Sequence, residues 1–308
     1  MNSSFLDNQK KFLQSAVLSL TPPFPQRIML EVTNRCNHKC IFCAHSSMSR
    51  KQTIMNLNLC EKILAECHEL GSNECALHGG SEPFLHPDID KIIGLTKKYK
   101  YSYVYLSTNG TACTKEKMTA ALEAGLDSIK FSINGGNPEE YKKIHGVDGF
   151  NYVLSMVEHT IAWRKKHNKN LKIYISSIQC SQNRNLSTLK EKYTDIIDAV
   201  EIIDAVWTGK KTNLPREEQQ KIPKCTEVFQ RTTFTADGSM RICCNDADNY
   251  LVVGSIADNV KNISAIWNGE LYVKMRECFL SNTLPQNSLC HACLMFEEHL
   301  IHPLAKCF

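Results

Sequence analysis

The sequence has no long hydrophobic run. No stretch approaches the roughly 18 consecutive apolar residues that a membrane-spanning helix requires. The N-terminal segment also lacks a basic start followed by an apolar core, so it does not resemble a secretory signal peptide. We therefore expect a cytoplasmic protein with no membrane partner.

Charge of one sign is equally scarce. The formal net charge is +4 over 308 residues, and the densest basic run is Arg164–His167. A run this short is more typical of a solvated helix face than of a nucleic-acid patch. The sequence has no arginine-rich arm and no stripe of aromatic and basic residues, so we expect no nucleic-acid partner.

Cysteine, in contrast, is abundant, with 15 residues in the chain. A secreted disulfide scaffold is normally a far shorter chain. In a reducing cytosol, clustered cysteines are more often metal ligands or reactive thiols. Most of the isolated cysteines fall on expected helices or strands and are typical of core positions; the isolated ones are Cys60, Cys67, Cys75, Cys113, Cys180 and Cys307. The clustered cysteines are the first indication of function.

Short apolar runs alternate with helical stretches over residues 25–209. The expected strands are Arg27–Thr33, Glu74–His78, Tyr103–Ser107, Ser128–Ile133, Lys172–Ile178 and Val200–Ile203. The expected helices are Leu57–Leu70, Pro87–Lys98, Lys115–Ala124, Tyr152–Lys166 and Leu186–Ile196. This alternation predicts an α/β fold with right-handed crossovers and a parallel sheet. Six units are too few for a closed eight-fold barrel, so we expect an open partial (β/α)6 TIM-like barrel with its site at the carboxyl ends of the strands.

Three other regions flank the expected barrel. Residues 1–24 predict an N-terminal helical extension that ends in a proline-rich stretch, and residues 210–224 predict a polar linker. Residues 225–308 predict a small cysteine-rich domain, in which Thr233–Ile242 has the pattern of two strands joined by an Asp-Gly turn. We expect bound metal to contribute to the stability of so small a domain.

The densest cysteine motif follows the first expected strand. Cys36, Cys40 and Cys43 have the spacing C-x3-C-x2-C on one short loop. Three thiolates can hold three corners of a [4Fe–4S] cluster and leave the fourth iron open for a ligand. A structural zinc site is the alternative, with His38 or His45 as the fourth ligand.

This loop, with the aromatic Phe42 before its last cysteine, resembles the signature loop of radical S-adenosylmethionine (radical SAM) enzymes. The resemblance implies that the open iron binds S-adenosylmethionine (AdoMet). It also implies that an electron from a donor such as flavodoxin or ferredoxin cleaves AdoMet to a 5′-deoxyadenosyl radical, which removes a hydrogen atom from the substrate. The protein then binds, orients and shields the reactants.

Three later loops, each after an expected strand, agree with the same family in order and spacing. His78–Pro87 resembles the G-x-G-E-P-L-L-x-P loop that contacts the amino group of AdoMet, although Ser81 replaces a glycine. Ser107–Thr111 resembles the S-T-N-G loop near the nucleoside, and Ser132–Gly135 resembles the S-I-D/N-G segment. The resemblance implies a set of cofactor-binding residues, namely Phe42, Gly80, Ser81, Glu82, Ser107, Asn109 and Ser132.

The C-terminal cysteines resemble those of the auxiliary-cluster domains called SPASM and, in shortened form, twitch. The resemblance implies one auxiliary [4Fe–4S] cluster held by Cys225, Cys243, Cys290 and Cys293. Cys278 is an alternative ligand, and a zinc ribbon with the same four thiolates is an alternative site. The adjacent Cys244 is left over, as either a catalytic hydrogen-atom donor or an inert buried thiol.

The combination of two clusters predicts an oxidoreductase that resembles dehydrogenases of the 2-deoxy-scyllo-inosamine type. In such an enzyme the auxiliary cluster accepts the electron left on the substrate, which we expect to be a sugar, an aminocyclitol or a related small molecule. An epimerase or a peptide-modifying enzyme (RiPP maturation) of the same superfamily is the first alternative. A non-catalytic iron–sulfur or zinc protein for binding or redox sensing is the second, and it would need none of the three later loops.

Overall fold

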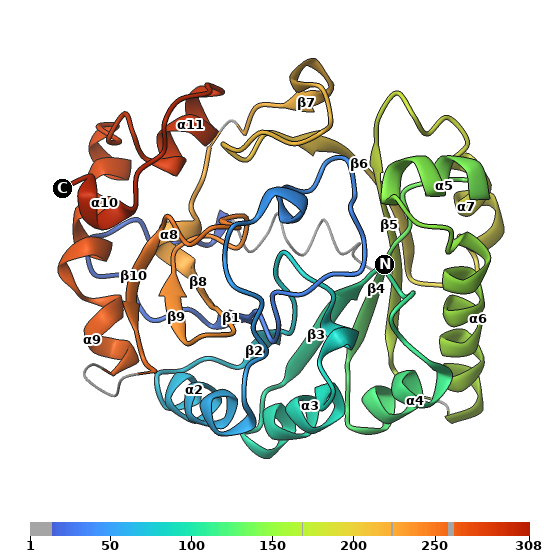
Figure 1. Cartoon of the computed structure of the whole chain (residues 1–308). Coiled ribbons are helices and arrows are strands. Elements are labelled where there is room, and N and C mark those ends of the chain that lie inside the picture. The colour runs from blue at the N-terminus through green and yellow to red at the C-terminus, as the bar shows by residue number, and fades with distance from the viewer. Residues whose placement is uncertain (1–13, 168, 223, 258–261) are drawn as a thin grey trace.

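The computed structural model of the chain describes residues 14–167, 169–222, 224–257 and 262–308. Its centre is one open sheet, in which the ten described strands have the order β10-β9-β8-β1-β2-β3-β4-β5-β6-β7 (Figure 1). The strands are β1 Arg27–Leu30, β2 Glu74–Ala76, β3 Tyr103–Thr108, β4 Ser128–Ser132, β5 Lys172–Gln179, β6 Ala199–Val206, β7 Gln219–Gln220, β8 Arg231–Phe234, β9 Ser239–Arg241 and β10 Val252–Ser255. The ladders from β8 to β7 are parallel, and those of β9 with β8 and β10 are antiparallel. The predicted α/β fold with an open parallel sheet is therefore confirmed.

Helices cover the outer face of the parallel strands (Figure 1). Those of the barrel are α2 Leu57–Glu69, α3 Ile89–Lys98, α4 Lys115–Glu123, α5 Pro138–His145, α6 Phe150–His167 and α7 Ser187–Tyr193. The C-terminal part has α8 Glu227–Gln230, α9 Ile263–Trp267, α10 Glu270–Ser281 and α11 Leu289–Met295, and single 3-10 turns lie at Ala44–Ser47, Pro83–Leu85, Arg216–Glu218 and Leu304–Lys306. None of the described helices is both long enough and apolar enough to cross a membrane.

Helix α5 is a short element that the sequence analysis did not expect. Both of its ends nevertheless carry sequence signals. The side chain of Asn137 caps the first turn by accepting the N–H of Glu140, and Pro138 occupies the first helical position. Gly146 ends the helix in the left-handed region, at a φ of 74°. The helix places its last turn against the cysteine loop.

The boundaries differ from expectation in two further places. The segment 210–224, expected as a linker, adds the two-residue strand β7 to the edge of the sheet beside β6. The helix expected over residues 1–24 falls largely on residues 1–13, which lie outside the described residues, and residues 16–24 form no helix.

The cysteine-rich C-terminal region continues the barrel sheet. Its predicted hairpin is present, with β8 and β9 antiparallel across an Asp-Gly turn. Strand β8 also pairs in parallel with β1, from Arg27 opposite Arg231 to Leu30 opposite Phe234. Backbone hydrogen bonds, which side-chain patterning does not reveal, therefore join the two expected domains.

The two faces of the sheet have different environments. Ile129 and Phe131 of β4 belong to the large apolar core beneath the helices. A smaller cluster on the opposite, inner face contains Met29, Ala76, Tyr105 and Tyr174. Because side chains alternate along a strand, residues between the core positions point toward this inner face.

Glu31, directly after β1, lies between two arginines and is 1% exposed. The guanidinium of Arg50 donates to both of its carboxylate oxygens, at 2.9 and 2.7 Å. The fully buried Arg241 of β9 donates to one of the same oxygens at 3.0 Å. One carboxylate therefore joins β1, the segment after the cysteine loop, and the C-terminal hairpin.

We predict that Glu31→Ala lowers the free energy of unfolding by about 3–5 kcal/mol, because it leaves the buried guanidinium of Arg241 and the half-buried guanidinium of Arg50 without their carboxylate. Urea denaturation of the metal-free protein measures the change. Glu139→Ala is the matched control, since it breaks the exposed pair with Lys143 and should change stability little. Equal stability of the two variants would contradict the role given to Glu31.

Candidate functional site

The cysteine loop, residues 36–43, is fixed by the last turn of α5. The N–H of Lys39 donates to the carbonyl of His145 at 3.1 Å, and the N–H of Ile41 donates to the carbonyl of Ile144 at 3.0 Å. Carbonyls in the last turn of a helix have no partner within the helix, so the loop satisfies them. The middle of the loop is thereby held at the carboxyl end of the sheet.

The three thiols of this loop affect one another. Burial raises the pKa of Cys36 to about 11 and raises the pKa of Cys40 and Cys43 as well. The neighbouring thiols add to the shift at Cys40. The thiols therefore keep their protons at neutral pH, and a bound metal would supply the positive charge that converts them to thiolates.

The spacing of the sulfurs bears on the choice between zinc and a cluster. Within the described residues, no three cysteine sulfurs lie within 4.8 Å of one another. One tetrahedral zinc ion, with Zn–S bonds of about 2.3 Å, would draw its sulfurs to about 3.8 Å from each other. The described thiols are therefore not drawn together as a single zinc ion would draw them.

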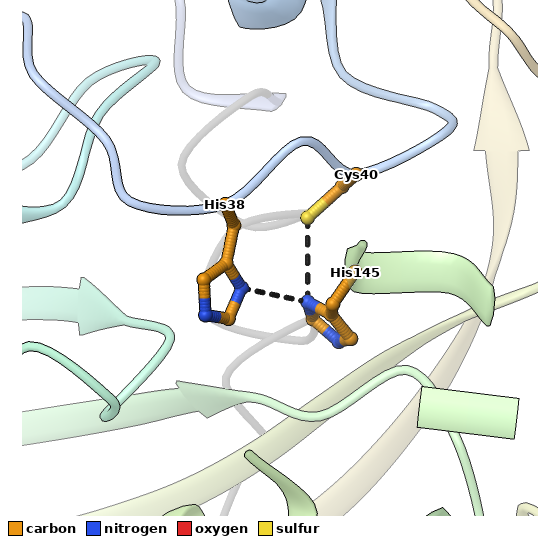
Figure 2. Close-up of side chains that lie close together, drawn as sticks. All are labelled: His38, Cys40 and His145. Atoms are coloured by element: carbon orange, nitrogen blue, oxygen red, sulfur yellow. Dashed lines mark hydrogen bonds between the residues drawn. The ribbon is translucent and has the colours of Figure 1, made fainter. Parts of the chain in front are cut away.

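Two buried histidines lie beside Cys40 (Figure 2). His145 Nδ1 is 3.1 Å from His38 Nδ1 and 3.3 Å from Cys40 Sγ. Burial lowers the pKa of His38 to about 4 and that of His145 to about 3, so both rings are neutral. The sequence analysis considered His38 only as a zinc ligand and did not find His145, although the Asn-Pro start and glycine end of α5 could have indicated its helix.

Glu82 joins the loops that follow β2 and β3. Its carboxylate accepts the N–H of Phe84 at 3.0 Å, the hydroxyl of Thr108 at 2.7 Å and the N–H of Asn109 at 2.7 Å. Burial raises the pKa of Glu82 to about 7, although these three donors act in the opposite direction. A cation beside the carboxyl would lower the pKa again, which fits the ammonium group expected here.

Asn109 also connects the loop after β3 to the cysteine loop. Its side-chain amide donates to Asn37 Oδ1 at 2.9 Å, and Asn37 in turn donates to Thr111 Oγ1 at 2.9 Å. Thr111 completes the ring by donating its hydroxyl hydrogen to Asn109 Oδ1 at 2.9 Å. The loops after β1, β2 and β3 therefore form one hydrogen-bonded unit.

The other expected cofactor-binding residues lie around this unit. The hydroxyls of Ser81 and Ser107 are buried and have no hydrogen-bond partner among the described residues, so they remain available to a ligand. Gly80 is exposed and has open space around it, while Phe42 and Ser132 are partly buried. Their contacts with AdoMet stay predictions.

The inner face of the sheet carries two charged residues that the sequence analysis missed. Lys130 lies between the core residues of β4 and opposite Ser107 and Tyr174 on the neighbouring strands. Glu201 of β6 is 6% exposed. Burial lowers the pKa of Lys130, while the charges of Glu201 and Cys244 act in the opposite direction. The amine, the carboxyl and the Cys244 thiol therefore lie near one another.

The C-terminal cysteines form a second group of neighbouring thiols. Burial raises the pKa of Cys225 to about 12, with further effects from Cys293 and Cys244. Burial also raises the pKa of Cys290, with contributions from Cys225 and Cys293. Cys278, the alternative ligand, lies on α10. Cys225, Cys290 and Cys293 therefore lie near one another, and their role with Cys243 as ligands of an auxiliary cluster stays a prediction.

Cys243 and Cys244 contact different parts of the structure. Cys243 packs against the large core, and Cys244 packs against the inner-face cluster. Their mutual hydrogen bond raises the pKa of Cys243 and lowers that of Cys244, which Arg231 and Arg241 lower further. The assignment of Cys243 as ligand and Cys244 as the remaining thiol stays a prediction, and this packing supports it.

Two family models match the chain. Residues 30–162 match the radical SAM superfamily, and residues 225–294 match SPASM, an iron–sulfur cluster-binding domain. The first region contains the cysteine loop and the second contains all four expected auxiliary ligands. AdoMet and a [4Fe–4S] cluster are the cofactors that a radical SAM domain implies, and an auxiliary cluster is implied by a SPASM domain. The resemblance inferred from the sequence motifs is confirmed.

The chain is also similar to individual proteins. It is 33% identical to the probable GTP 3′,8-cyclase of Methanothermobacter thermautotrophicus over 129 residues, which are 42% of this chain and 41% of that protein. The match thus spans less than half the length of this relative. The structure of anSMEcpe with bound AdoMet has a TM-score of 0.63 at 18% identity and covers 93% of this chain and 91% of that one. BtrN in complex with AdoMet and 2-DOIA has a TM-score of 0.56 at 17% identity and covers 88% of this chain and 92% of that one.

We predict that the anaerobically reconstituted protein binds about eight irons and eight sulfides, as two four-iron clusters. Combined replacement of Cys36, Cys40 and Cys43 by alanine should remove about half of the iron. Iron and sulfide analysis with absorption spectra measures both. Stoichiometric zinc without cluster absorbance would contradict both cluster sites.

We predict that Glu82→Ala lowers the free energy of unfolding of the metal-free protein by about 1–3 kcal/mol, because three buried donors lose their acceptor. AdoMet binding should weaken in the same variant if the carboxyl contacts the ammonium group. Thermal unfolding and equilibrium dialysis measure the two effects. Glu123→Ala, at the exposed end of α4, is the control.

Proposed function

This chain carries a radical SAM domain followed by a SPASM iron–sulfur domain, and from that premise we propose that it oxidises a carbon atom of a small polar molecule, such as a sugar or an aminocyclitol. The observation that carries the proposal is the polar inner face of the sheet. Lys130 lies on that face opposite Tyr174, and the charges of Glu201 and Cys244 act on its amine. Glu201 is buried and the other two side chains are half-buried, which suits contact with a polar substrate.

The cysteines of the two groups would hold the two clusters, with Cys36, Cys40 and Cys43 in the first and Cys225, Cys243, Cys290 and Cys293 in the second. When bound, AdoMet and the clusters supply an acceptor for one hydrogen atom and an acceptor for one electron. Conversion of an alcohol to a carbonyl releases a hydrogen atom, an electron and a proton. The chain itself must therefore supply a group that takes the proton.

Lys130 is the residue best suited to accept that proton. Its burial lowers its pKa, so a neutral amine is more accessible than for an exposed lysine. The neutral Nζ can accept the hydroxyl proton of the substrate, and the neighbouring carboxyl of Glu201 would stabilise the ammonium that forms. Lys130 is accordingly proposed as the general base of the reaction.

Cys244 decides between this proposal and an epimerase. An epimerase needs a thiol that returns a hydrogen atom to the opposite face of the substrate carbon. The hydrogen bond from the Cys243 thiol lowers the pKa of Cys244 most, and Arg231 and Arg241 lower it further. The first effect is lost when Cys243 holds a cluster, but the two arginines remain and favour the Cys244 thiolate, which has no hydrogen atom to donate. The electrostatic environment of Cys244 therefore supports the dehydrogenase.

The first substrate to test is an aminocyclitol. BtrN, which shares the fold of this chain, is complexed with 2-DOIA. An aminocyclitol carries hydroxyl groups and an ammonium group. On the inner face, the carboxyl of Glu201 would contact the ammonium group and the amine of Lys130 would contact a hydroxyl group. This chemistry, together with the shared fold, supports the choice.

We predict that the reduced protein cleaves AdoMet and converts 2-deoxy-scyllo-inosamine or a related aminocyclitol to a ketone. Lys130→Met should still produce 5′-deoxyadenosine but lose most of the ketone, whereas Cys244→Ala should retain the ketone. Mass spectrometry of both products measures the outcome. Lys142→Met, on the exposed side of α5, is the matched control.

The opposite result has a distinct signature. The wild type in deuterated water would then form a redox-neutral product that carries deuterium, and Cys244→Ala would not form it. This result would contradict the dehydrogenase and support the epimerase. A thiol exchanges its hydrogen with solvent, which is why the label would appear only in that case.

A further inference from the structure

His38, Cys40 and His145 lie close enough together to hold a metal ion (Figure 2). The hydrogen bonds of His145 indicate that it is a hydrogen-bond donor and not a metal ligand. The backbone N–H of Asn134 donates to His145 Nε2 at 3.1 Å. A ring nitrogen that accepts a hydrogen bond carries no proton, so the single proton of this ring is on Nδ1. The nitrogen that faces Cys40 is therefore a donor and has no lone pair for a metal.

The same reasoning shows which ring nitrogen of His38 carries the proton. Its Nε2 lies 2.7 Å from Thr111 Oγ1. Thr111 uses its own hydrogen to donate to Asn109 Oδ1, so Oγ1 accepts from His38. The proton of His38 is then on Nε2, and its Nδ1 is an acceptor. The N–H of His145 consequently has two acceptors, His38 Nδ1 and Cys40 Sγ.

The position of this donor is fixed by the backbone. The carbonyl of His145 accepts the N–H of Lys39, next to Cys40, at 3.1 Å. The same residue is thus tied to the cysteine loop through its main chain and faces a cysteine sulfur through its side chain. The donor and the sulfur keep their relative position because both ends of the contact belong to one short hydrogen-bonded unit.

We propose that His145 is a positioning residue that donates its Nδ1–H to the Cys40 thiolate and raises the reduction potential of the cluster held by the cysteine loop, an inference that rests on the proposed radical SAM function. Reduction by an external one-electron donor adds negative charge to the cluster and its thiolates. A hydrogen bond to a thiolate stabilises that charge, and hydrogen bonds to sulfur are among the factors that set cluster potentials. His38 weakens the effect because it shares the same N–H.

The proposal gives opposite signs for two neighbouring histidines. His145→Leu removes the donor and should lower the potential. His38→Leu removes the competing acceptor, so Cys40 receives the whole hydrogen bond and the potential should rise. His145→Asn is the conservative variant, because its amide nitrogen occupies the position of Nδ1 and can still donate. A general loosening of the loop would not produce this pattern.

The experiment is a dithionite titration of the wild type and the three variants, followed by electron paramagnetic resonance of the cluster whose spectrum changes on addition of AdoMet. Iron content is measured in each sample. At the wild-type midpoint we expect His145→Leu to show an about tenfold lower ratio of reduced to oxidised cluster, equal to about 59 mV for a one-electron couple. His145→Asn should stay within about twofold of wild type, and His38→Leu should show a higher ratio.

An unchanged potential in a fully loaded His145→Leu, or shifts of the same sign in both leucine variants, would overturn the proposal. If His145→Leu fails to hold the cluster, the potential of His38→Leu tests the proposal instead. An unchanged or lower potential in His38→Leu overturns the proposal. Absence of an AdoMet-responsive cluster in wild type would contradict the proposed function instead, so the two failures are distinguishable.

Discussion

The buried carboxylate of Glu31 is the interaction on which the arrangement of both cysteine groups depends. A buried charge of this kind is tolerated only when it is paired, and Arg50 and Arg241 provide the pairing from two distant segments. Arg50 lies shortly after the first cysteine group, and Arg241 lies two residues before Cys243. The ion pairs therefore bring the two groups to the same part of the sheet.

Further hydrogen bonds complete the arrangement around the first cysteine group. Glu82 satisfies donors from the loops after β2 and β3, while Asn109 and Thr111 connect the second of these loops to the cysteine loop. Each loop alone would have several backbone and side-chain groups without partners. The carboxyl ends of adjacent parallel strands lie side by side, so these loops can satisfy one another.

The sequence predicted most of the features that depend on residues close together in the chain, and it did not predict those that depend on residues far apart. The six barrel strands were found because their apolar runs are short and separated by periodic helices. The cysteine loop was found because its three cysteines lie close together in the sequence. Helix α5 was missed because Pro138–His145 is mostly polar and its caps were not used. Lys130 and Glu201 are single charged residues on different strands, with no shared motif, and only the sheet brings them together. A change in composition suggested a separate C-terminal domain, whereas the pairing of β8 with β1 depends on residues about 200 positions apart.

That pairing also bears on electron transfer. Four pairs of residues connect β1 and β8 in one parallel ladder, so the segment 210–224 joins the two cysteine groups in sequence but does not set the distance between them. A hinge motion would have to break the ladder. Two clusters bound at these groups would therefore keep a separation that is set by the sheet.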